Sequence, residues 1–336
     1  MHASSPAPST PDTAQPGTGQ PDASPLHAEI YSQPDCWVRA AQDAPRYAGA
    51  LPAPGERVAV VGCGTSLYIA RAYAFLREEA GQGLTDAWPG SEARLHREYD
   101  RIIAITRSGT TTEILDLLDR YRSGNAGNSA PGNSAPENKA KARITVITGT
   151  AGSPVLSRGD AITLAEFDET AVVQTRFATS VLALLRAHLG EDLAPVIAAA
   201  RALLAAGPQA ALEGVRGAAQ ISFAGMGLGA ALAEEAALKL RESTQSWVEA
   251  YHATEYRHGP ISIAEPGRAV WALGPLVPGF ARDVAATGAH LEHRDIDPMA
   301  ELVRVHLLCL QRAADLGLDA GSPRNLTRSI ILDGHN

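Results

Sequence analysis

Two stretches of this chain, 163 residues apart, repeat the same pattern of glycines and apolar residues. Residues 60–79 read VVGCGTSLYIARAYAFLREE and residues 222–242 read SFAGMGLGAALAEEAALKLRE, so that Gly62 falls on Gly225 and Gly64 on Gly227. Each stretch begins with an apolar run suited to a buried strand, passes through a glycine turn and continues with helical periodicity. A unit of strand, turn and helix that occurs twice predicts an internal duplication with two related α/β halves.

The first half continues this alternation. Three short runs rich in β-branched residues, typical of strands buried on both faces, span 57–62, 101–106 and 143–148. Helical patterns follow them at 66–79, 112–122 and 169–189. Strands that alternate with helices predict a parallel, doubly wound α/β sheet of the flavodoxin-like kind, and we place this first domain at residues 26–206.

The second half shows a shorter version of the same rhythm. After an Ala/Leu-rich helix at 193–206, strand candidates and a final helix occur at 220–225, 269–274, 290–294 and 299–316. The smaller number of strand candidates predicts a second domain, at 207–336, that has lost a βα unit. Two low-complexity segments predict a disordered tail at 1–25 and an inserted flexible loop at 123–140.

Charge and cysteine content exclude several classes of protein. The formal net charge is −8 and no dense Lys/Arg run occurs, which argues against a nucleic-acid partner held by counterion release. Cys36, Cys63 and Cys309 are far apart and lack metal-ligand spacing, so we expect no metal, no disulfide framework and a reducing, cytoplasmic location. No apolar stretch approaches the ~18 residues of a membrane span, so we expect no membrane partner.

The loop after the second predicted strand is dense in hydroxyl groups. In TRSGTTTE, residues 106–113, they surround Gly109 just before a helix and belong to Thr106, Ser108, Thr110 and Thr111. Ligands of parallel sheets bind beyond the carboxyl ends of strands, where helix N-termini offer free N–H groups, and Gly109 would let the backbone approach a ligand. We predict a phosphate cradle; the alternative is an ordinary helix cap. The corresponding second-half loop, GPLVPG, has no hydroxyls, so we expect one phosphate site per chain.

The glycine turn after the first predicted strand has two interpretations. A dinucleotide loop is disfavoured because Leu67 occupies the position of the third glycine and no convincing acidic strand end follows, so we expect no NAD and no other cofactor. Thr65 and Ser66 would instead offer hydroxyls to a sugar, or simply cap the helix. Cys63 is more typical of a small buried residue than of a nucleophile.

Six motifs in order resemble the sugar isomerase (SIS) family, in particular the isomerase half of glucosamine-6-phosphate synthase and SIS-type glucosamine-6-phosphate deaminases. They are AEIYSQP at 28–34, VVGCGTS at 60–66, ITRSGTTTE at 105–113, ALKLRE at 237–242, EAY and EYRHGP within 249–260, and SPRNLTRS at 322–329. The resemblance implies two SIS domains in tandem and a phosphorylated sugar as ligand. It assigns the phosphate to the loop that contains Thr106, Ser108, Gly109 and Thr111. It assigns the sugar to the loop that contains Cys63, Gly64, Thr65 and Ser66.

The same resemblance implies the catalytic residues. Glu242 corresponds to the base that moves a proton between sugar carbons C1 and C2, and Lys239 to its neighbour in the site. His258 corresponds to the ring-opening acid/base, which relatives take from the second subunit, so a homodimer with shared active sites is implied. These roles suit a carboxylate and an imidazole. From the residues alone, the first two also fit a surface i,i+3 ion pair, and His258 fits a helix C-terminal histidine that interacts with the dipole.

Two arginines depart from the family pattern. Arg328 stands where the synthase tail has a lysine that forms a Schiff base, which arginine does not do, so an aminating mechanism is disfavoured while electrostatic support of an open-chain sugar stays open. Arg107 stands where the synthase has Gln, and either adds charge to the phosphate site or points to solvent. Because only a tail precedes AEIYSQP in this sequence, glutamine is not expected as a nitrogen donor.

The sequence therefore predicts an enzyme that isomerises or deaminates a hexose or hexosamine 6-phosphate, with chemistry of the glucosamine 6-phosphate to fructose 6-phosphate type. Two alternatives stay open. One is a catalytically silent phosphosugar sensor, against which the lack of an apparent helix-turn-helix argues. The other is an ammonia-dependent aminating enzyme.

Overall fold

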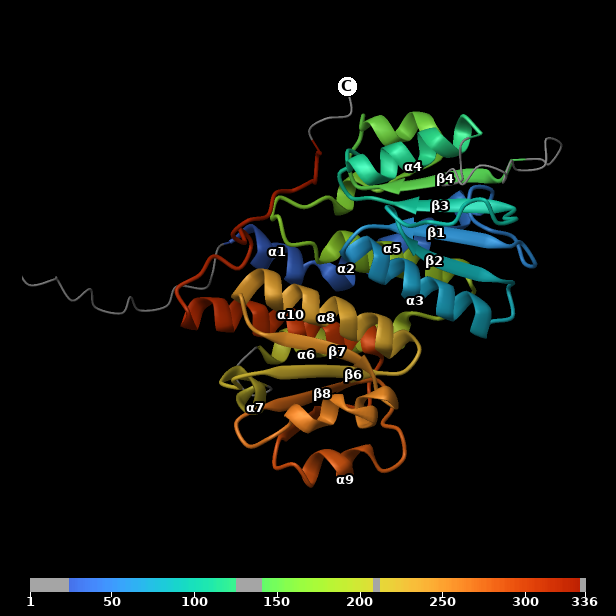
Figure 1. Ribbon diagram of the computed structural model, residues 1–336. Helices are drawn as coiled ribbons and strands as arrows, with labels where there is room; N and C mark the ends of the chain where they lie inside the picture. Colours follow the sequence, from blue (N-terminus) through green and yellow to red (C-terminus); the bar gives the residue numbers. More distant parts are fainter. Residues whose placement is uncertain (1–23, 125–140, 208–211, 333–336) are drawn as a thin grey trace, which may run out of the picture.

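The computed structural model describes residues 24–124, 141–207 and 212–332. Apart from a few boundary residues, the expected tail and inserted loop lie outside these ranges. Two parallel sheets are held apart by a layer of helices from both halves of the chain, including α2, α3, α5, α8 and α10 (Figure 1). The fold is α/β, with two parallel sheets and interleaved helices, as predicted.

Sheet A is formed by the first half. Its strands are β1 (Val58–Gly62), β2 (Thr85–Pro89), β3 (Arg101–Ile105), β4 (Arg143–Thr148) and β5 (Asp160–Thr163). They are all parallel, in the order β2-β1-β3-β4-β5, which is the flavodoxin-like order. Every residue of β1 and β3 is buried, because helices cover both faces of the sheet.

Sheet B repeats this connectivity with one strand fewer. Its strands are β6 (Ile221–Gly225), β7 (Val248–His252), β8 (Ala269–Leu273) and β9 (His290–His293), all parallel and in the order β7-β6-β8-β9. The expectation of a shortened second sheet is confirmed.

Ten α-helices are described. They are α1 (Pro25–Tyr31), α2 (Gln33–Asp43), α3 (Thr65–Glu79), α4 (Thr112–Arg122), α5 (Arg176–His188), α6 (Ala194–Ala206), α7 (Glu213–Arg216), α8 (Leu228–Thr244), α9 (Phe280–Ala285) and α10 (Pro298–Asp315). Short 3₁₀ turns are η1 (Ala44–Tyr47), η2 (Pro154–Arg158), η3 (Ala165–Phe167), η5 (Glu255–His258) and η6 (Pro260–Ile263). None of the helices in the described ranges is long and apolar enough to cross a membrane.

The helix expected over 169–189 is wrong at its start, because α5 begins only at Arg176. The carboxylate of Glu169 accepts the backbone N–H groups of Thr175 at 2.6 Å and Arg176 at 2.7 Å, and so caps α5 from outside the helix. The segment before α5 is irregular and pairs with the C-terminal region, where Val172 N–H donates to the Gly321 carbonyl. Helical periodicity alone does not reveal a cap supplied from six residues away.

The two halves meet where α3 packs antiparallel on α8. A Cβ at Gly64, the start of α3, would lie 4.0 Å from Leu238, whereas a Cβ at Gly227, the start of α8, would overlap the ring of Phe75. Between these contacts Arg71 forms an ion pair with Glu234 at 2.5 Å. Arg71 and Glu234 are equivalent positions of the repeat, 163 residues apart. The contact of Gly64 with Leu238 is repeated with the two halves exchanged, because Gly227 is equivalent to Gly64 and Phe75 to Leu238. The two helices are therefore related by a local two-fold axis.

This docking has one consequence for function. Because α3 and α8 are antiparallel, the C-terminal part of α8 lies beside the start of α3, at the carboxyl edge of sheet A. Of the residues predicted to be catalytic, Lys239 and Glu242 in this part of α8 therefore lie near the glycine turn that is predicted to bind the sugar. Both helices begin at a glycine with positive φ, 55° at Gly64 and 52° at Gly227, which an L side chain adopts only with strain.

Candidate functional site

The predicted phosphate cradle, residues 106–111, is braced from two sides at the carboxyl edge of sheet A. Its backbone is bonded to the neighbouring loop, with Gly149 N–H donating to the Arg107 carbonyl at 3.0 Å and Val155 N–H to the Gly109 carbonyl at 3.2 Å. Within the loop, the Thr106 hydroxyl accepts from Gly109 N–H at 3.3 Å. These hydrogen bonds hold the backbone of the loop against the neighbouring segment.

Thr111 and Gly109 show how the cradle is built. Thr111 is the N-cap residue of α4, yet its side chain makes no capping bond, so the helix-cap alternative is wrong for this hydroxyl. Gly109 has a φ of 65°, and a Cβ there would overlap the side chain of Ser153. Glycine is therefore required at this position by backbone conformation and by packing against Ser153. The Ser153 hydroxyl is buried and has no hydrogen-bond partner among the described residues.

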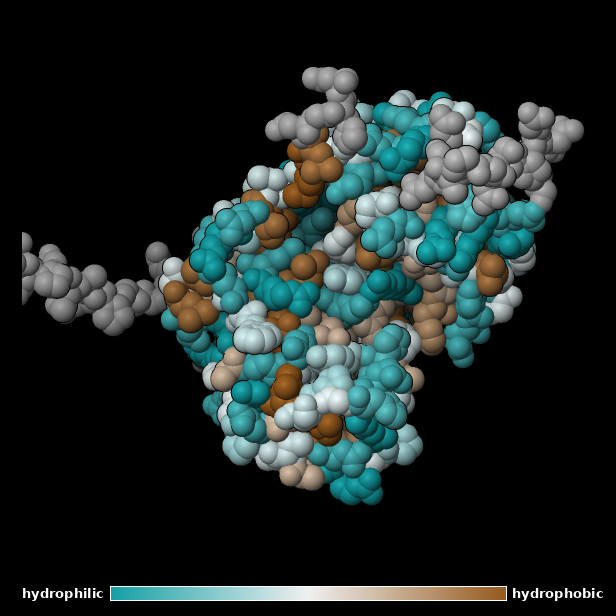
Figure 2. All heavy atoms as spheres, in the orientation of Figure 1, coloured by the Kyte–Doolittle hydropathy of each residue, from teal (hydrophilic) through white to brown (hydrophobic). Residues whose placement is uncertain are grey.

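A C-terminal segment, residues 327–332, lies along the cradle, and we call it the strap (red coil in Figure 1). The Ser329 hydroxyl accepts from Ser108 at 3.1 Å and from Thr110 at 2.9 Å. Beyond it, Thr112 N–H donates to the Ile330 carbonyl at 3.2 Å, and Leu332 N–H to the Thr112 hydroxyl at 3.0 Å. The end of the strap, residues 330–332, is apolar and exposed, and hydrophobic spheres lie on this part of the surface in the space-filling view (Figure 2).

Arg328 and Arg107 are both engaged by the protein. The Arg328 guanidinium pairs with Asp168 at 2.5 Å and donates to the Glu169 carbonyl. Arg107 is 3% exposed, donates to the carbonyls of Ala171 at 2.9 Å and Arg328 at 3.1 Å, and faces the buried Glu169 carboxylate at 3.8 Å. The interpretation that Arg107 points to solvent is wrong, because its side chain fastens the cradle to the strap.

Lys239 and Glu242 form a largely buried ion pair on α8. Their charged atoms are 2.6 Å apart, and the exposed fractions of the side chains are 1% for Lys239 and 16% for Glu242, so the interpretation as a surface pair is wrong. Burial alone would lower the pKa of Lys239, but the charges of Glu235 and Glu242 reverse this and hold its pKa above the ordinary value. A lysine that stays charged beside a partly accessible carboxylate can stabilise negative charge on a ligand.

The glycine turn of the first half contacts this part of α8. The Thr65 hydroxyl donates to Glu235 at 3.2 Å, one helical turn from Lys239. Because the N-cap of α3 is Gly64 and Thr65 and Ser66 lie inside the helix, the capping alternative is wrong for both hydroxyls. Cys63 is partly buried, and burial, with a smaller contribution from Glu113, raises the pKa of its thiol. It therefore does not resemble an activated nucleophile.

His258 is the one predicted site residue that lies elsewhere. It is exposed, ends η5, and follows β7 at the carboxyl edge of sheet B. The helix α8 begins at that same edge and carries Glu242 away from it, by ~21 Å over the fourteen residues from Leu228. Within one chain, His258 and Glu242 therefore lie near opposite ends of sheet B.

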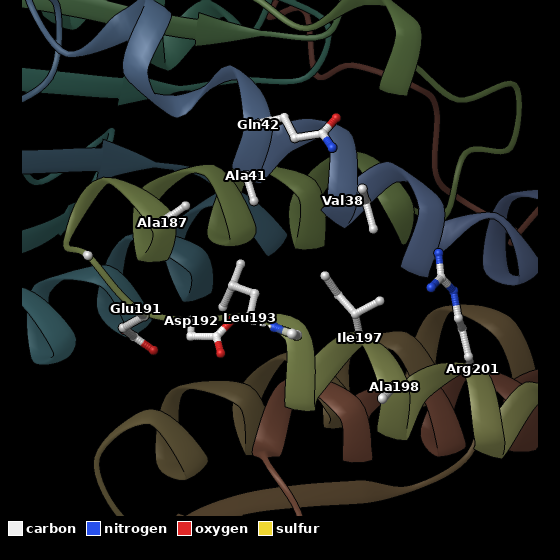
Figure 3. A pocket seen from close by; sticks show the side chains of 12 residues that line it. Val38, Ala41, Gln42, Ala187, Glu191, Asp192, Leu193, Ile197, Ala198 and Arg201 are labelled. Atoms are coloured by element: carbon white, nitrogen blue, oxygen red, sulfur yellow. Dashed lines mark hydrogen bonds between the residues drawn. The ribbon is translucent and has the colours of Figure 1, made fainter.

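Two structural features bear on other kinds of site. Among the residues that the structure describes, no group of three or more His, Cys, Asp or Glu side chains has the geometry of a metal site. An open cavity of about 550 Å³ lies between α2, the end of α5 and α6, and Figure 3 shows its lining. Aliphatic side chains such as Val38, Leu193 and Ile197 predominate there, with Arg201 at one side held by Asp35. We assign no ligand to this cavity.

The chain has relatives of known name. It is 27% identical over 83% of its length to the glutamine–fructose-6-phosphate aminotransferase (isomerizing) of Symbiobacterium thermophilum, and 27% identical over 91% to that of Aeropyrum pernix. It spans about half of those proteins, 52% and 57% respectively. The solved structure of a glucosamine-6-phosphate deaminase from Thermotoga maritima shares the fold, with a TM-score of 0.75 and 21% identity over 92% of this chain and 100% of that one. No family model matches the chain.

Proposed function

We propose that this chain binds a hexose or hexosamine 6-phosphate at the carboxyl edge of sheet A and isomerises or deaminates it by acid/base chemistry. One observation supports the proposal: α8 carries the buried Lys239–Glu242 pair and docks on α3, where Glu235 accepts the Thr65 hydroxyl of the glycine turn. The cradle follows β3, the neighbour of β1 in sheet A, so it opens at the same edge of the sheet as this turn. A phosphate site, a sugar-facing turn and a carboxylate in one place are the parts that an enediol isomerisation requires.

The relatives support the same class of chemistry. The aminotransferases are named for acting on fructose 6-phosphate and for isomerising, and the solved relative is named a glucosamine-6-phosphate deaminase. Because the chain covers about half of the aminotransferases, their complete reaction is not transferred to it. What the two groups of names share is a hexose 6-phosphate that carries oxygen or nitrogen at C2.

In the proposed mechanism the cradle holds the phosphate through hydroxyl and backbone N–H groups. Glu242 takes the proton from C2 of the open-chain aldose while the aldehyde oxygen O1 gains a proton, which gives the enediol. O2 then gives up its hydroxyl proton and the same carboxyl returns the carbon-bound proton to C1, which gives the ketose. With an amino group on C2 the product is a ketose imine, and water hydrolyses this imine to fructose 6-phosphate and ammonia. Lys239 stabilises the negative charge that develops near C1 and C2.

The anchoring of Arg328 favours deamination over amination. The resemblance implied a tail lysine that forms an imine with the ketose, and the residue here is an arginine whose guanidinium is bound to Asp168 and the Glu169 carbonyl. Arginine stays protonated and is not a nucleophile toward a carbonyl. We therefore propose glucosamine 6-phosphate to fructose 6-phosphate plus ammonia as the direction to test first.

The test is to incubate the pure protein with a panel of hexose and hexosamine 6-phosphates and to measure ammonia and ketose. Isothermal calorimetry on the same panel measures binding. Ammonia and fructose 6-phosphate from glucosamine 6-phosphate are the expected result, and ketose from an aldose phosphate without ammonia would narrow the function to isomerisation. Tight binding of a sugar phosphate with no turnover of any member would overturn the enzyme and favour a sensor.

A further inference from the structure

A third ionisable side chain, that of Glu235, lies on the face of α8 that carries Lys239 and Glu242. Glu235 is 1% exposed, and its Oε1 lies 3.6 Å from the Lys239 ammonium and accepts the hydroxyl hydrogen of Thr65 at 3.2 Å. The second oxygen, Oε2, is buried and has no hydrogen-bond partner among the described residues. Glu235, Lys239 and Glu242 are four and three residues apart on α8, and this spacing keeps the three side chains in one row along the helix.

This row contains one ammonium and two carboxyl groups. Lys239 is closer to Glu242, at 2.6 Å, than to Glu235, at 3.6 Å. Burial raises the pKa of Glu235 to about 8, the charge of Lys239 opposes this and the charge of Glu242 adds to it. Around neutral pH, Glu235 therefore keeps its proton and the ammonium belongs to Glu242.

We propose that Glu235 is a positioning residue. Lys239 divides its charge between the carboxyl groups of Glu242 and Glu235, and Glu235 thereby controls how readily Glu242 takes a proton from the sugar. The proposal rests on the function proposed above. When the carbon-bound proton moves to Glu242, that carboxyl becomes neutral, the electron pair stays on the sugar as an enediolate, and Lys239 keeps its three protons. Its ammonium then loses the carboxylate at 2.6 Å and stabilises the enediolate, while an ionised Glu235 at 3.6 Å keeps a carboxylate beside the ammonium.

Other groups that face this row do not supply the same counter-charge. Burial lowers the pKa of His306 on α10 to about 3 and raises that of Cys309 to about 12, so both are uncharged between pH 6 and 10. Tyr68 on α3 also has a raised pKa, chiefly through burial. Glu169, before α5, is the remaining carboxyl group, and its nearest charged partner is Arg107 rather than Lys239.

The proposal predicts a particular pH dependence. Glu235 must be ionised to receive the ammonium, so turnover of the wild-type protein rises as pH passes through the range near 8 in which Glu235 loses its proton. In Glu235→Gln this rise is absent. At pH 9 we expect a kcat roughly 10-fold below that of the wild type, with KM unchanged. This loss is a part of the ~10²–10⁴-fold that a positioned general base supplies. Glu234→Gln is the matched control, because Glu234 is the adjacent residue on α8 and pairs with Arg71 instead.

A second readout needs no turnover. Glutamate labelled with ¹³C at the carboxyl carbon is followed by NMR from pH 4 to 10 in the wild type, Glu235→Gln and Glu242→Gln. One resonance titrates near pH 8 in the wild type, disappears in Glu235→Gln, and moves to lower pH in Glu242→Gln because a like charge has been removed. Glu242→Gln alone suffices if Glu235→Gln does not fold.

The outcomes separate the two proposals. An active wild-type protein whose pH profile is unaltered by Glu235→Gln, or whose high-pH carboxyl resonance is unmoved by Glu242→Gln, overturns the role of Glu235 and leaves the enzyme proposal standing. A wild-type protein that turns over no sugar phosphate overturns the enzyme proposal and the role of Glu235 with it, whatever the NMR titration shows.

Discussion

At the scale of single residues, Glu242 is the member of the α8 charge row that a ligand can reach, because 16% of its side chain remains exposed while Lys239 is 1% exposed. Glu242→Gln keeps the shape of the side chain and removes its capacity to accept a proton. We expect turnover to fall at least ~100-fold with little change in affinity. Exchange of the C1 or C2 hydrogen of a bound sugar phosphate with deuterated water, followed by NMR, measures the loss directly.

The repeat supplies a control for this substitution. Glu79 is the residue of α3 that corresponds to Glu242 and it is exposed, so Glu79→Gln is expected to leave hydrogen exchange unchanged. Equal exchange in wild type and Glu242→Gln would remove this carboxylate from the mechanism.

The cradle makes a separate prediction about binding. Ser108→Ala together with Thr111→Ala should weaken sugar-phosphate binding by ~2–3 kcal/mol, because charge-assisted hydrogen bonds contribute ~1.5–3 kcal/mol each and are not additive. Isothermal calorimetry measures the change. Ser157→Ala, in an exposed serine of η2, is the control and should have no effect. Unchanged affinity in a folded double variant would contradict the assignment of the cradle.

At the scale of elements, the strap is held mainly by contacts of Arg328 and Ser329 with the cradle region. Arg328→Ala removes the partly exposed pair with Asp168, worth about 1 kcal/mol, so the amides of Thr112 and Leu332 that depend on the strap should exchange with solvent roughly 5-fold faster. Hydrogen exchange read by mass spectrometry or NMR tests this. Arg324→Ala, in an exposed arginine that precedes the strap, should change neither amide, and equal effects of the two substitutions would refute the anchoring role.

The elements that the sequence predicted are those with a simple burial pattern. The central strands β1, β3, β6 and β8 are buried at every residue and read as continuous apolar runs. The edge strands β2, β5 and β7, which read TDAWP, DAIT and VEAYH, are partly exposed, so no apolar run marks them and they were not predicted. Their existence follows from pairing with β1, β4 and β6, which is a tertiary effect.

The candidate site shows the same division. Motifs identified Glu242, Lys239 and the cradle, because each belongs to a short local pattern. Glu235, Ser153 and Ser329 were missed, since their contacts join segments far apart in the chain: Glu235 meets Thr65, and Ser329 meets Ser108 and Thr110. The one available signal was the repeat itself, because antiparallel docking of its two helices would have placed the middle of α8 against the start of α3.

At the scale of the whole molecule, the local two-fold relates two potential sites, and the predicted site residues gather at only one of them. The counterpart of Lys239 on α3 is Leu76, and the counterpart of the cradle, GPLVPG, lacks hydroxyl groups. The carboxyl edge of sheet B instead presents His258, exposed and distant from Glu242 of its own chain. If both residues serve one reaction, as the resemblance implies, the histidine must come from another copy of the chain.

This arrangement predicts complementation in a homodimer. Glu242→Gln and His258→Ala proteins should each be inactive, and a mixture whose subunits exchange should regain activity, because a mixed dimer pairs the intact Glu242 of one chain with the intact His258 of the other. Random exchange makes half of the dimers mixed, each with one of two sites intact, so about a quarter of wild-type activity is expected. Light scattering establishes the dimer, and mass-labelled chains establish exchange. Mixing Glu242→Gln with the double variant Glu242→Gln/His258→Ala is the control, since no combination of those chains contains an intact Glu242. Demonstrated exchange without recovery would place the two residues in different roles, and a monomer with full activity would exclude the shared site.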